Sequence, residues 1–212
     1  MSIYVFNKGD DKSVDFVYRS LKNDGMSRFG WSWFDKANLA ELKEKPWAEM
    51  TEDEILVWSK TKFLLNIKEN DWVVHINVPY WGKCVAAQVS GTYFFEENDN
   101  EISDFRHCLI INPNSIVEFD RNADEVHPLI SRRLKLQSRY WQIYAEKEFF
   151  ETLENLKNGT KIDKTSNSKE VHYLKEEIIP IFSEITRKVH KTHIGKNLEN
   201  LVCEIFITNT KV

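Results

Sequence analysis

The first part of the chain alternates a strand pattern with a helix pattern. Residues 2–6 form an apolar, β-branched run that ends in a polar turn, which predicts a strand. Apolar residues then recur at helical spacing between Ser13 and Gly25. We expect Ser13 to cap this helix and Gly25 to end it.

Two more helices are predicted before residue 70. Asp35 can cap a short helix that runs to Leu42 and ends before Pro46. Thr51 and Glu54 stand three residues apart at the start of an apolar periodic run. This spacing is that of a capping box, in which each side chain bonds the other residue's backbone N–H. It marks the clearest helix start in the chain.

From residue 71 the pattern changes to short strands separated by turn residues. The expected strands, with Gly91 breaking the second from the third, are 72–78, 84–90, 92–96, 107–111 and 116–119. Short strands with turns between them are typical of a curved sheet or small barrel. Because helices precede and follow them, we predict an α+β fold, a small curved β-barrel flanked by helices.

The last third of the chain is predicted to be helical and divided by a linker. A helix is expected at 146–158, ended by Gly159, and a polar stretch follows it. Beyond that stretch, apolar residues trace one helical face. The predicted organisation is a domain at 1–158, a linker at 159–169 and a C-terminal helical extension at 170–212.

Four aromatic residues fall within the six-residue stretch Phe29-Gly-Trp-Ser-Trp-Phe34. If the stretch is extended, Phe29, Trp31 and Trp33 point to one side because side chains alternate along a strand. Two neighbouring indoles can form the walls of a site for a flat guest such as a nucleobase. They can equally belong to the core, where large aromatics more commonly pack.

One segment carries a local excess of positive charge. The net charge of −4 argues against a chain that coats nucleic acid indiscriminately. Between Pro128 and Tyr144, however, no acidic residue occurs, and aromatic residues accompany four cations, Arg132, Arg133, Lys135 and Arg139. Cations among aromatics are typical of a phosphate-contacting edge. The alternative is a solvated face whose charge is balanced elsewhere.

Other chemical signals point to a soluble, cytoplasmic chain without catalytic machinery. The three cysteines are far apart and lack zinc spacing, which fits a reducing compartment. No secretory signal and no membrane-length apolar run is recognised. No phosphate loop or hydrolase motif occurs, so we expect no cofactor and no catalytic residue. His190 and His193 have metal-ligand spacing, but a helix end that favours cations explains them more simply.

The order of these features resembles the EVE and YTH branch of the PUA-like superfamily. The resemblance rests on the Trp-bearing stretch after the first helix and on Trp72-Val-Val-His-Ile-Asn-Val-Pro-Tyr-Trp-Gly-Lys-Cys-Val-Ala-Ala-Gln-Val-Ser-Gly91. It covers roughly residues 2–145. It implies a curved barrel that binds a modified base, typically methylated, in an aromatic cage after base flipping.

The resemblance also implies base-binding residues. Trp31 or Trp33 matches the cage Trp, and Ser32 matches the small polar position beside it. Candidates for a second wall and for polar edge contacts are Tyr80, Trp81, Asp104 and His107. For Asp104 and His107 a loop salt bridge and a strand-end histidine are equally common roles. His75 and Asn77 share one strand face, where a hydrogen-bonded structural role is favoured.

The tail from Gly195 to Phe206 resembles the first helix of restriction-endonuclease-like domains, with Glu199 at the acidic position. In that family a following Asp and a Glu-x-Lys complete the metal site, and neither follows Glu199 here. The leading expectation is therefore a non-enzymatic specificity module of a modification-dependent restriction or defence system. Its partner would be DNA carrying a modified base, and its nuclease would be absent, truncated or on another chain.

Two alternatives stay open. The helices beyond Val171 can serve as a scaffold for a partner protein or a homodimer through their apolar face. A PUA-like domain can also bind RNA, because aromatic stacking serves single-stranded RNA as well as DNA.

Overall fold

Seven strands form one mixed sheet in the part of the chain that the structure describes. The structure is a computed structural model, and it describes residues 1–7, 11–97 and 100–162. The strands are β1 (Ile3–Asn7), β2 (Met26–Phe29), β3 (Trp72–Ile76), β4 (Lys83–Phe95), β5 (His107–Ile111), β6 (Val117–Asp120) and β7 (Tyr140–Ile143). The helices are α1 (Asp11–Arg19), α2 (Leu39–Glu44), α3 (Glu52–Thr61), α4 (Pro128–Arg133) and α5 (Glu146–Asn158).

The strand order is β2-β5-β4-β3-β1-β7, and β6 pairs with β4 outside this path. β1 and β3 run parallel, whereas the other pairs are antiparallel. The predicted α+β class is confirmed. The predicted small curved barrel is not confirmed, because the sheet is not closed: its path ends at β2 and β7, which do not pair with each other.

The sheet nevertheless curls until its two edges approach each other. In a flat sheet β2 and β7 would lie five strand spacings apart, roughly 24 Å. Instead the ring of Phe29, at the end of β2, lies 6.3 Å from the ring of Tyr140, at the start of β7. Phe63 stacks on Tyr140 at 3.6 Å and meets Phe29 edge-on at 5.3 Å. Aromatic packing therefore joins the two edges in place of backbone hydrogen bonds.

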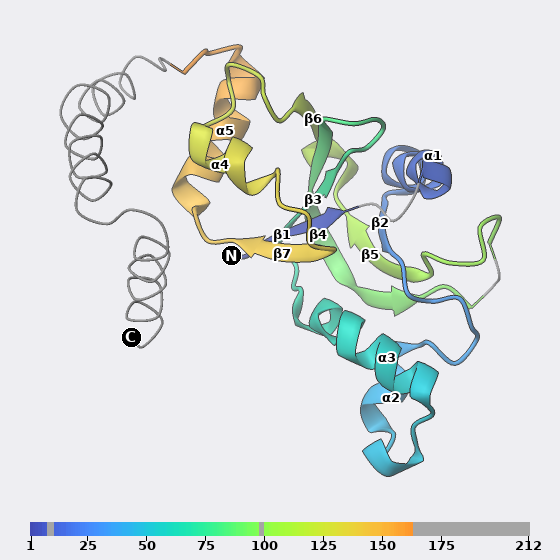
Figure 1. Ribbon diagram of the computed structural model, residues 1–212. Coiled ribbons are helices and arrows are strands. Elements are labelled where there is room, and N and C mark those ends of the chain that lie inside the picture. Colours follow the sequence, from blue (N-terminus) through green and yellow to red (C-terminus); the bar gives the residue numbers. More distant parts are fainter. Residues whose placement is uncertain (8–10, 98–99, 163–212) are drawn as a thin grey trace, which may run out of the picture. The chain divides into compact units, whose positions relative to one another are not determined.

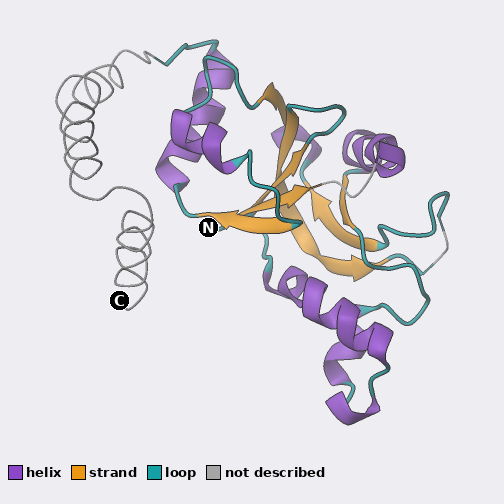
Figure 2. Ribbon diagram, in the orientation of Figure 1, coloured by secondary structure: helices purple, strands orange, loops and turns teal. Residues whose placement is uncertain are grey.

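Both faces of the sheet are buried under helices (Figure 1). Side chains alternate along β1, so Tyr4 and Phe6 enter one core while Ile3 and Val5 enter the other. The first core is covered by α1, α2 and α3, and the second by α4 and α5. Figure 2 shows the same division, with the strands between two groups of helices. This layering leaves the rim of the sheet, where β1, β2 and β7 end or begin, as the open part of the fold.

β4 differs from the prediction, which had two separate strands broken at Gly91. β4 is continuous through Gly91, with its register against β5 shifted between Val89 and Tyr93. A Cβ at Gly91 would lie 3.0 Å from the Cβ of Ile110 on β5. Glycine thus permits close approach of two strands at a bulge and does not end the strand.

Helix ends follow the sequence in some places and depart from it in others. The Thr51–Glu54 capping box is present, and Gly25 and Gly159 end their helices with left-handed backbone, as predicted. The prediction that Ser13 caps the first helix was wrong, because Ser13 lies inside α1, which begins at Asp11. The expected cap at Asp35 was also wrong, because Asn38 caps α2 through a side-chain bond from the N–H of Ala40.

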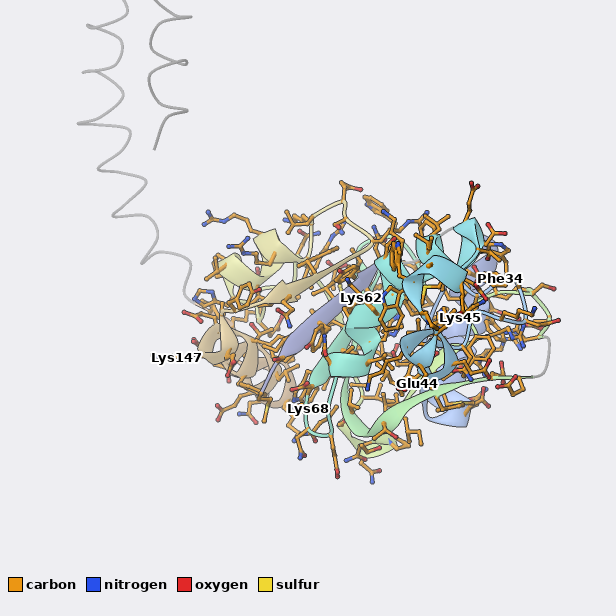
Figure 3. All side chains as sticks on the ribbon, turned by 90° about the horizontal axis from the view of Figure 1, so that it is seen from below. Phe34, Glu44, Lys45, Lys62, Lys68 and Lys147 are labelled. Atoms are coloured by element: carbon orange, nitrogen blue, oxygen red, sulfur yellow. The ribbon has the colours of Figure 1, made fainter. Side chains whose placement is uncertain are left out.

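An ion pair between the partly exposed Lys45 and the buried Glu54 ties the end of α2 to the start of α3. Lys45 contacts both carboxylate oxygens of Glu54, at 2.8 and 2.7 Å. The hydrogen bond from Lys45, followed by that from the backbone N–H of Thr51, holds the pKa of Glu54 below its usual range. Figure 3 shows this side of the molecule, with Lys45 among the helices right of centre and Lys147 of α5 at the left edge.

Several predictions concern residues outside the described part of the chain. These are most of the linker at 159–169, the extension at 170–212, His190, His193 and Glu199. Within the described residues, no helix combines the length and apolar character needed to cross a bilayer.

Candidate functional site: an aromatic pocket at the sheet rim

A pocket of about 270 Å³ opens where β2 ends, beside the end of β1 and the start of β7. Its lining combines four aromatic side chains with three polar ones and one glycine: Asn7, Phe29, Gly30, Trp31, Trp33, Asp104, Phe105 and Arg139. The curl of the sheet brings these segments together. Trp31, Trp33, Asp104 and Arg139 were predicted site residues, and they meet at one place.

The Trp-rich stretch is not the extended strand expected from its alternation. β2 ends at Phe29, and Trp31 has left-handed backbone with φ of 75°. Such a conformation is strained for a bulky residue. The bend turns Trp31 and Trp33 toward each other, with ring centroids 5.8 Å apart and planes at 54°. They form a corner of the pocket, and Trp33 is 45% exposed.

Asp104 joins the Trp stretch to the loop between β4 and β5. Its Oδ1 accepts hydrogen bonds from the backbone N–H and hydroxyl of Ser32, at 2.7 and 2.9 Å. The same oxygen accepts the N–H of Phe105 at 2.7 Å. Ser32 is fully buried, and its hydroxyl oxygen accepts the N–H of Arg106. Ser32 is therefore a structural connector behind the pocket, and it does not line it.

The second carboxylate oxygen of Asp104 faces the pocket over Gly30. A Cβ at Gly30 would lie 3.2 Å from this Oδ2 and 3.4 Å from the ring of Phe105. Any larger residue at 30 would push the carboxylate and the ring apart. No donor among the described residues bonds Oδ2, so this oxygen can accept a hydrogen bond from a guest.

His107 lies behind Trp31, although we predicted it as an edge contact for a base. It is 1% exposed, and burial lowers its pKa to about 4, so the ring is neutral at physiological pH. Its Nε2 lies 3.2 Å from the carbonyl oxygen of Trp31, and Nδ1 lies 2.9 Å from the hydroxyl of Tyr93. The carbonyl can only accept, so Nε2 carries the proton and Nδ1 accepts from Tyr93. His107 thereby fixes the strained Trp31 backbone.

A buried arginine supports the same wall. Arg28, beside Phe29, donates to both oxygens of Glu96 at 2.6 and 3.0 Å, and to the carbonyl of Phe105 at 3.2 Å. The hydrogen bond from Arg28 holds the pKa of Glu96 below its usual range. Because Arg28 is only 4% exposed, this pair couples the end of β2 rigidly to the Phe105 loop.

Tyr80 and Trp81 do not line the pocket. They form the tip of the β3–β4 hairpin and are 59% and 67% exposed. The guanidinium of Arg121 stacks on the Trp81 ring at 4.8 Å, and the ammonium of Lys83 lies 5.8 Å from the Tyr80 ring. The structure thus separates the predicted cage residues into a pocket and an exposed tip.

The four predicted phosphate contacts lie at the end of α4 and in the segment that leads to β7. Arg132, Arg133, Lys135 and Arg139 are all exposed. None of them forms an ion pair within the described part of the chain. Arg139 also lines the pocket. The basic segment therefore begins at the pocket and extends away from it.

The remaining polar predictions have structural roles. The Nε2 of His75 bonds the hydroxyl of Ser27 at 2.8 Å, and burial lowers the pKa of His75 to about 3. Asn77 accepts the N–H of Gly82 within the hairpin. Cys84 is fully buried, and burial raises its pKa to about 12, so its thiol acts as a small apolar group. Among the described residues, no group of three His, Cys, Asp or Glu side chains could hold a metal ion.

Sequence reasoning missed Asn7, Gly30 and Phe105 as pocket residues. Gly30 and Phe105 stand inside motifs that were singled out, so their neighbours provided a signal. Asn7 had none, because it reaches the pocket only through the pairing of β1 with β3 and β7.

Comparison with models of known protein families gives no match, and none of the curated proteins matches the sequence significantly. The geometry of the pocket and of the basic segment must therefore carry any functional assignment.

Proposed function

We propose that this protein is a non-enzymatic nucleic-acid reader that holds one extruded base in the aromatic pocket. The observation that carries the proposal is the pocket's composition. Aromatic walls surround an unpartnered carboxylate oxygen of Asp104, and Arg139 lines the same pocket. The base is proposed to be modified, most simply methylated.

The size and walls of the pocket support a flat guest. Its volume of about 270 Å³ lies just below the range of roughly 300–1,000 Å³ seen for drug-sized ligands, so one heterocycle fits better than a dinucleotide. A base that leaves its stack needs replacement surfaces, and Trp31 and Trp33 offer two ring faces. Stacking on an aromatic contributes about 1–3 kcal/mol per base, which is comparable to the cost of extrusion.

The polar groups support recognition of a base edge. The Asp104 Oδ2 can accept from a ring N–H or an exocyclic amine. Asn7 uses its side-chain amide to donate to the carbonyl of Ser138, and its remaining N–H and that of Arg139 can donate to a guest carbonyl or ring nitrogen. Every nucleobase edge combines donors and acceptors, so a pocket with both suits this ligand class.

The basic segment supports binding of the backbone that carries the base. Arg132, Arg133 and Lys135 are exposed and lack acidic partners in the described residues, so they are available for phosphate oxygens. Phosphate neutralisation supplies much of nucleic-acid affinity. A net charge of −4 confines this attraction to the local segment.

The burial and neutrality of the two enclosed histidines support a binding role without catalysis. His75 and His107 are each at most 2% exposed and neutral, and both are bonded to structural partners. Neither can exchange a proton with a guest in the pocket.

The curled sheet with helices on both faces is compatible with the PUA-like fold and with its EVE and YTH branch, to which we propose that the chain belongs. The proposed place in a modification-dependent defence system, with a nuclease on another chain, comes from the resemblance alone. The tail residues concerned lie outside the described part.

A binding panel tests the proposal. The ligands are single-stranded DNA, duplex DNA and single-stranded RNA. Each is prepared with 5-methylcytosine, 5-hydroxymethylcytosine, 6-methyladenine or no mark. Fluorescence anisotropy gives the Kd of each ligand. We expect one mark to bind at least tenfold more tightly than its plain counterpart. Trp33→Ala should remove that preference. Trp47→Ala, which removes another exposed Trp, should not. A wild-type protein without preference for any mark contradicts the proposal.

A further inference from the structure

Tyr80 and Trp81 form a rigid, solvent-exposed aromatic tip that the pocket does not use. The turn is fixed by hydrogen bonds from Gly82 N–H to the Asn77 side chain at 3.2 Å and from Lys83 N–H to the Tyr80 carbonyl at 3.1 Å. Large aromatics held rigidly in solvent are typical of binding surfaces, because they give contact area at little entropic cost.

Two cations lie against the rings of the tip, and the acidic residues Asp120 and Glu118 lie beside it. Arg121 is 6% exposed, lies under the Trp81 ring and has no carboxylate partner within the described residues. Lys83 lies beside the Tyr80 ring, although Asp120 is 3.8 Å from its ammonium group. A stacking platform with cations at its base suits a polyanion that carries flat rings.

The basic segment connects this tip to the pocket. Near the tip, Arg121 donates to the carbonyl of Leu134 at 3.1 Å. Near the pocket, Asn7 N–H donates to the carbonyl of Arg139 at 2.9 Å. The segment is therefore fixed at both ends, and the five residues 135–139 between them span at most about 17 Å. The Trp81 ring lies against Arg121 at the Leu134 end of this segment. A stacked strand rises about 3.4 Å per nucleotide, so about five nucleotides cover the length of the segment itself.

We propose that the hairpin tip is a second nucleic-acid contact, in which Trp81, assisted by Tyr80, stacks on a base about five nucleotides or fewer from the base in the pocket. The strand between them follows the cations of residues 132–139. This inference rests on the proposed function for the identity of the pocket guest. It adds a site that sets the length of nucleic acid bound and leaves selection of the mark to the pocket.

The test uses 11-nucleotide single-stranded DNAs with a central 5-methylcytosine, 6-methyladenine or plain cytosine or adenine, and trinucleotides with the same centres. An 11-mer reaches the tip on either side of the pocket, whereas a trinucleotide does not. Trp81→Ala should weaken binding of every 11-mer roughly five- to tenfold, the low end of stacking contributions. It should leave trinucleotide affinity and the ratio of marked to plain binding unchanged.

Control variants separate stacking from folding. Trp81→Phe keeps a ring and should retain most of the affinity, while Trp47→Ala removes a Trp of similar exposure and should have no effect. As a second readout, 2-aminopurine placed three to five nucleotides from the mark should be quenched by wild type and less by Trp81→Ala. A thermal melt confirms that each variant is folded.

Each outcome decides between the two proposals. Equal binding of 11-mers by wild type and Trp81→Ala overturns the hairpin contact, and the reader function stands if the mark preference persists. Length-dependent binding that needs Trp81 but shows no mark preference supports the hairpin contact and refutes the reader function. An equal loss on trinucleotides places Trp81 at the pocket and overturns the separate site. A wild type that binds no oligonucleotide overturns both.

Discussion

The two aromatic pairs of this protein have nearly the same composition and quite different supports. Trp31 and Trp33 lie in a strained bend whose backbone is held by hydrogen bonds with His107 and Asp104. Tyr80 and Trp81 lie at a hairpin tip, where the cations of Lys83 and Arg121 contact the rings. The first pair lines a concave site and the second presents convex rings to solvent.

The difference lies in what each pair can recognise. A pocket with fixed walls and oriented polar groups can compare one guest with another, because a wrong edge leaves its groups unpaired. A convex platform adds affinity for any ring that reaches it. Perturbing the supports should therefore affect the two regions unequally.

Acidification should affect the pocket support most. His107 and His75 have folded-state pKa values of about 4 and about 3, against 6.5 in the unfolded chain. The unfolded state thus binds more protons below pH 6.5, so stability is fully present above that pH and falls steadily toward pH 4. From pH 7 to 5 we expect a loss of about 2 kcal/mol per histidine. Urea denaturation at several pH values measures it.

A variant sharpens the pH experiment. His107→Gln removes one of the two groups and should show about half of the wild-type pH dependence between pH 7 and 5. A free energy of unfolding that stays flat from pH 7 to 5 contradicts the assigned neutral histidines.

Asp104→Ala should be the next largest perturbation. It leaves the donors of Ser32 and Phe105 without their shared acceptor and should lower the free energy of unfolding by about 3 kcal/mol. Asp104→Asn keeps an acceptor oxygen, so it should lose about 1 kcal/mol while changing the group that faces the guest. Asp15→Ala, at an exposed ion pair, is the control and should stay within about 0.5 kcal/mol. Equal losses for Asp104→Ala and Asp15→Ala would show that Asp104 does not hold the wall.

Trp33→Ala and Trp81→Ala compare the two regions directly. Trp33 is 45% exposed, so its truncation should change stability little. We expect about a tenfold fall in the ratio of marked to plain affinity, roughly 1.4 kcal/mol, from one lost stacking face. Trp81→Ala should lower both affinities and keep the ratio. A reversed pattern would assign mark selection to the hairpin.

The smallest expected effect concerns the basic segment. Replacing Arg132 and Arg133 together by Gln removes two proposed phosphate contacts and should lower the slope of log K against log salt by about 2. Marked and plain ligands should weaken equally, because phosphates carry no information about the base. Titrations at several salt concentrations measure the slope. An unchanged slope would mean that these two arginines face solvent only.

Local features of the fold could be predicted because nearby residues determine them. The capping box at Thr51 and Glu54, the stop at Gly159 and strand β5 follow from spacing and residue type alone. Gly91 shows the limit of this reasoning. A glycine breaks a strand or allows a bulge depending on what faces it, and the close approach of Ile110 on β5 is a tertiary fact.

The sequence by itself determined the α+β class, the aromatic stretch and the basic segment, because periodicity, residue type and charge are local properties. Only the tertiary structure decided which residues meet. The curl of the sheet brings Asn7 and Arg139 to the Trp31 corner and places His107 behind it. It also leaves Tyr80 and Trp81 outside the pocket. One such contact joins Asn7 and Ser138, which are 131 positions apart, and no local pattern records it.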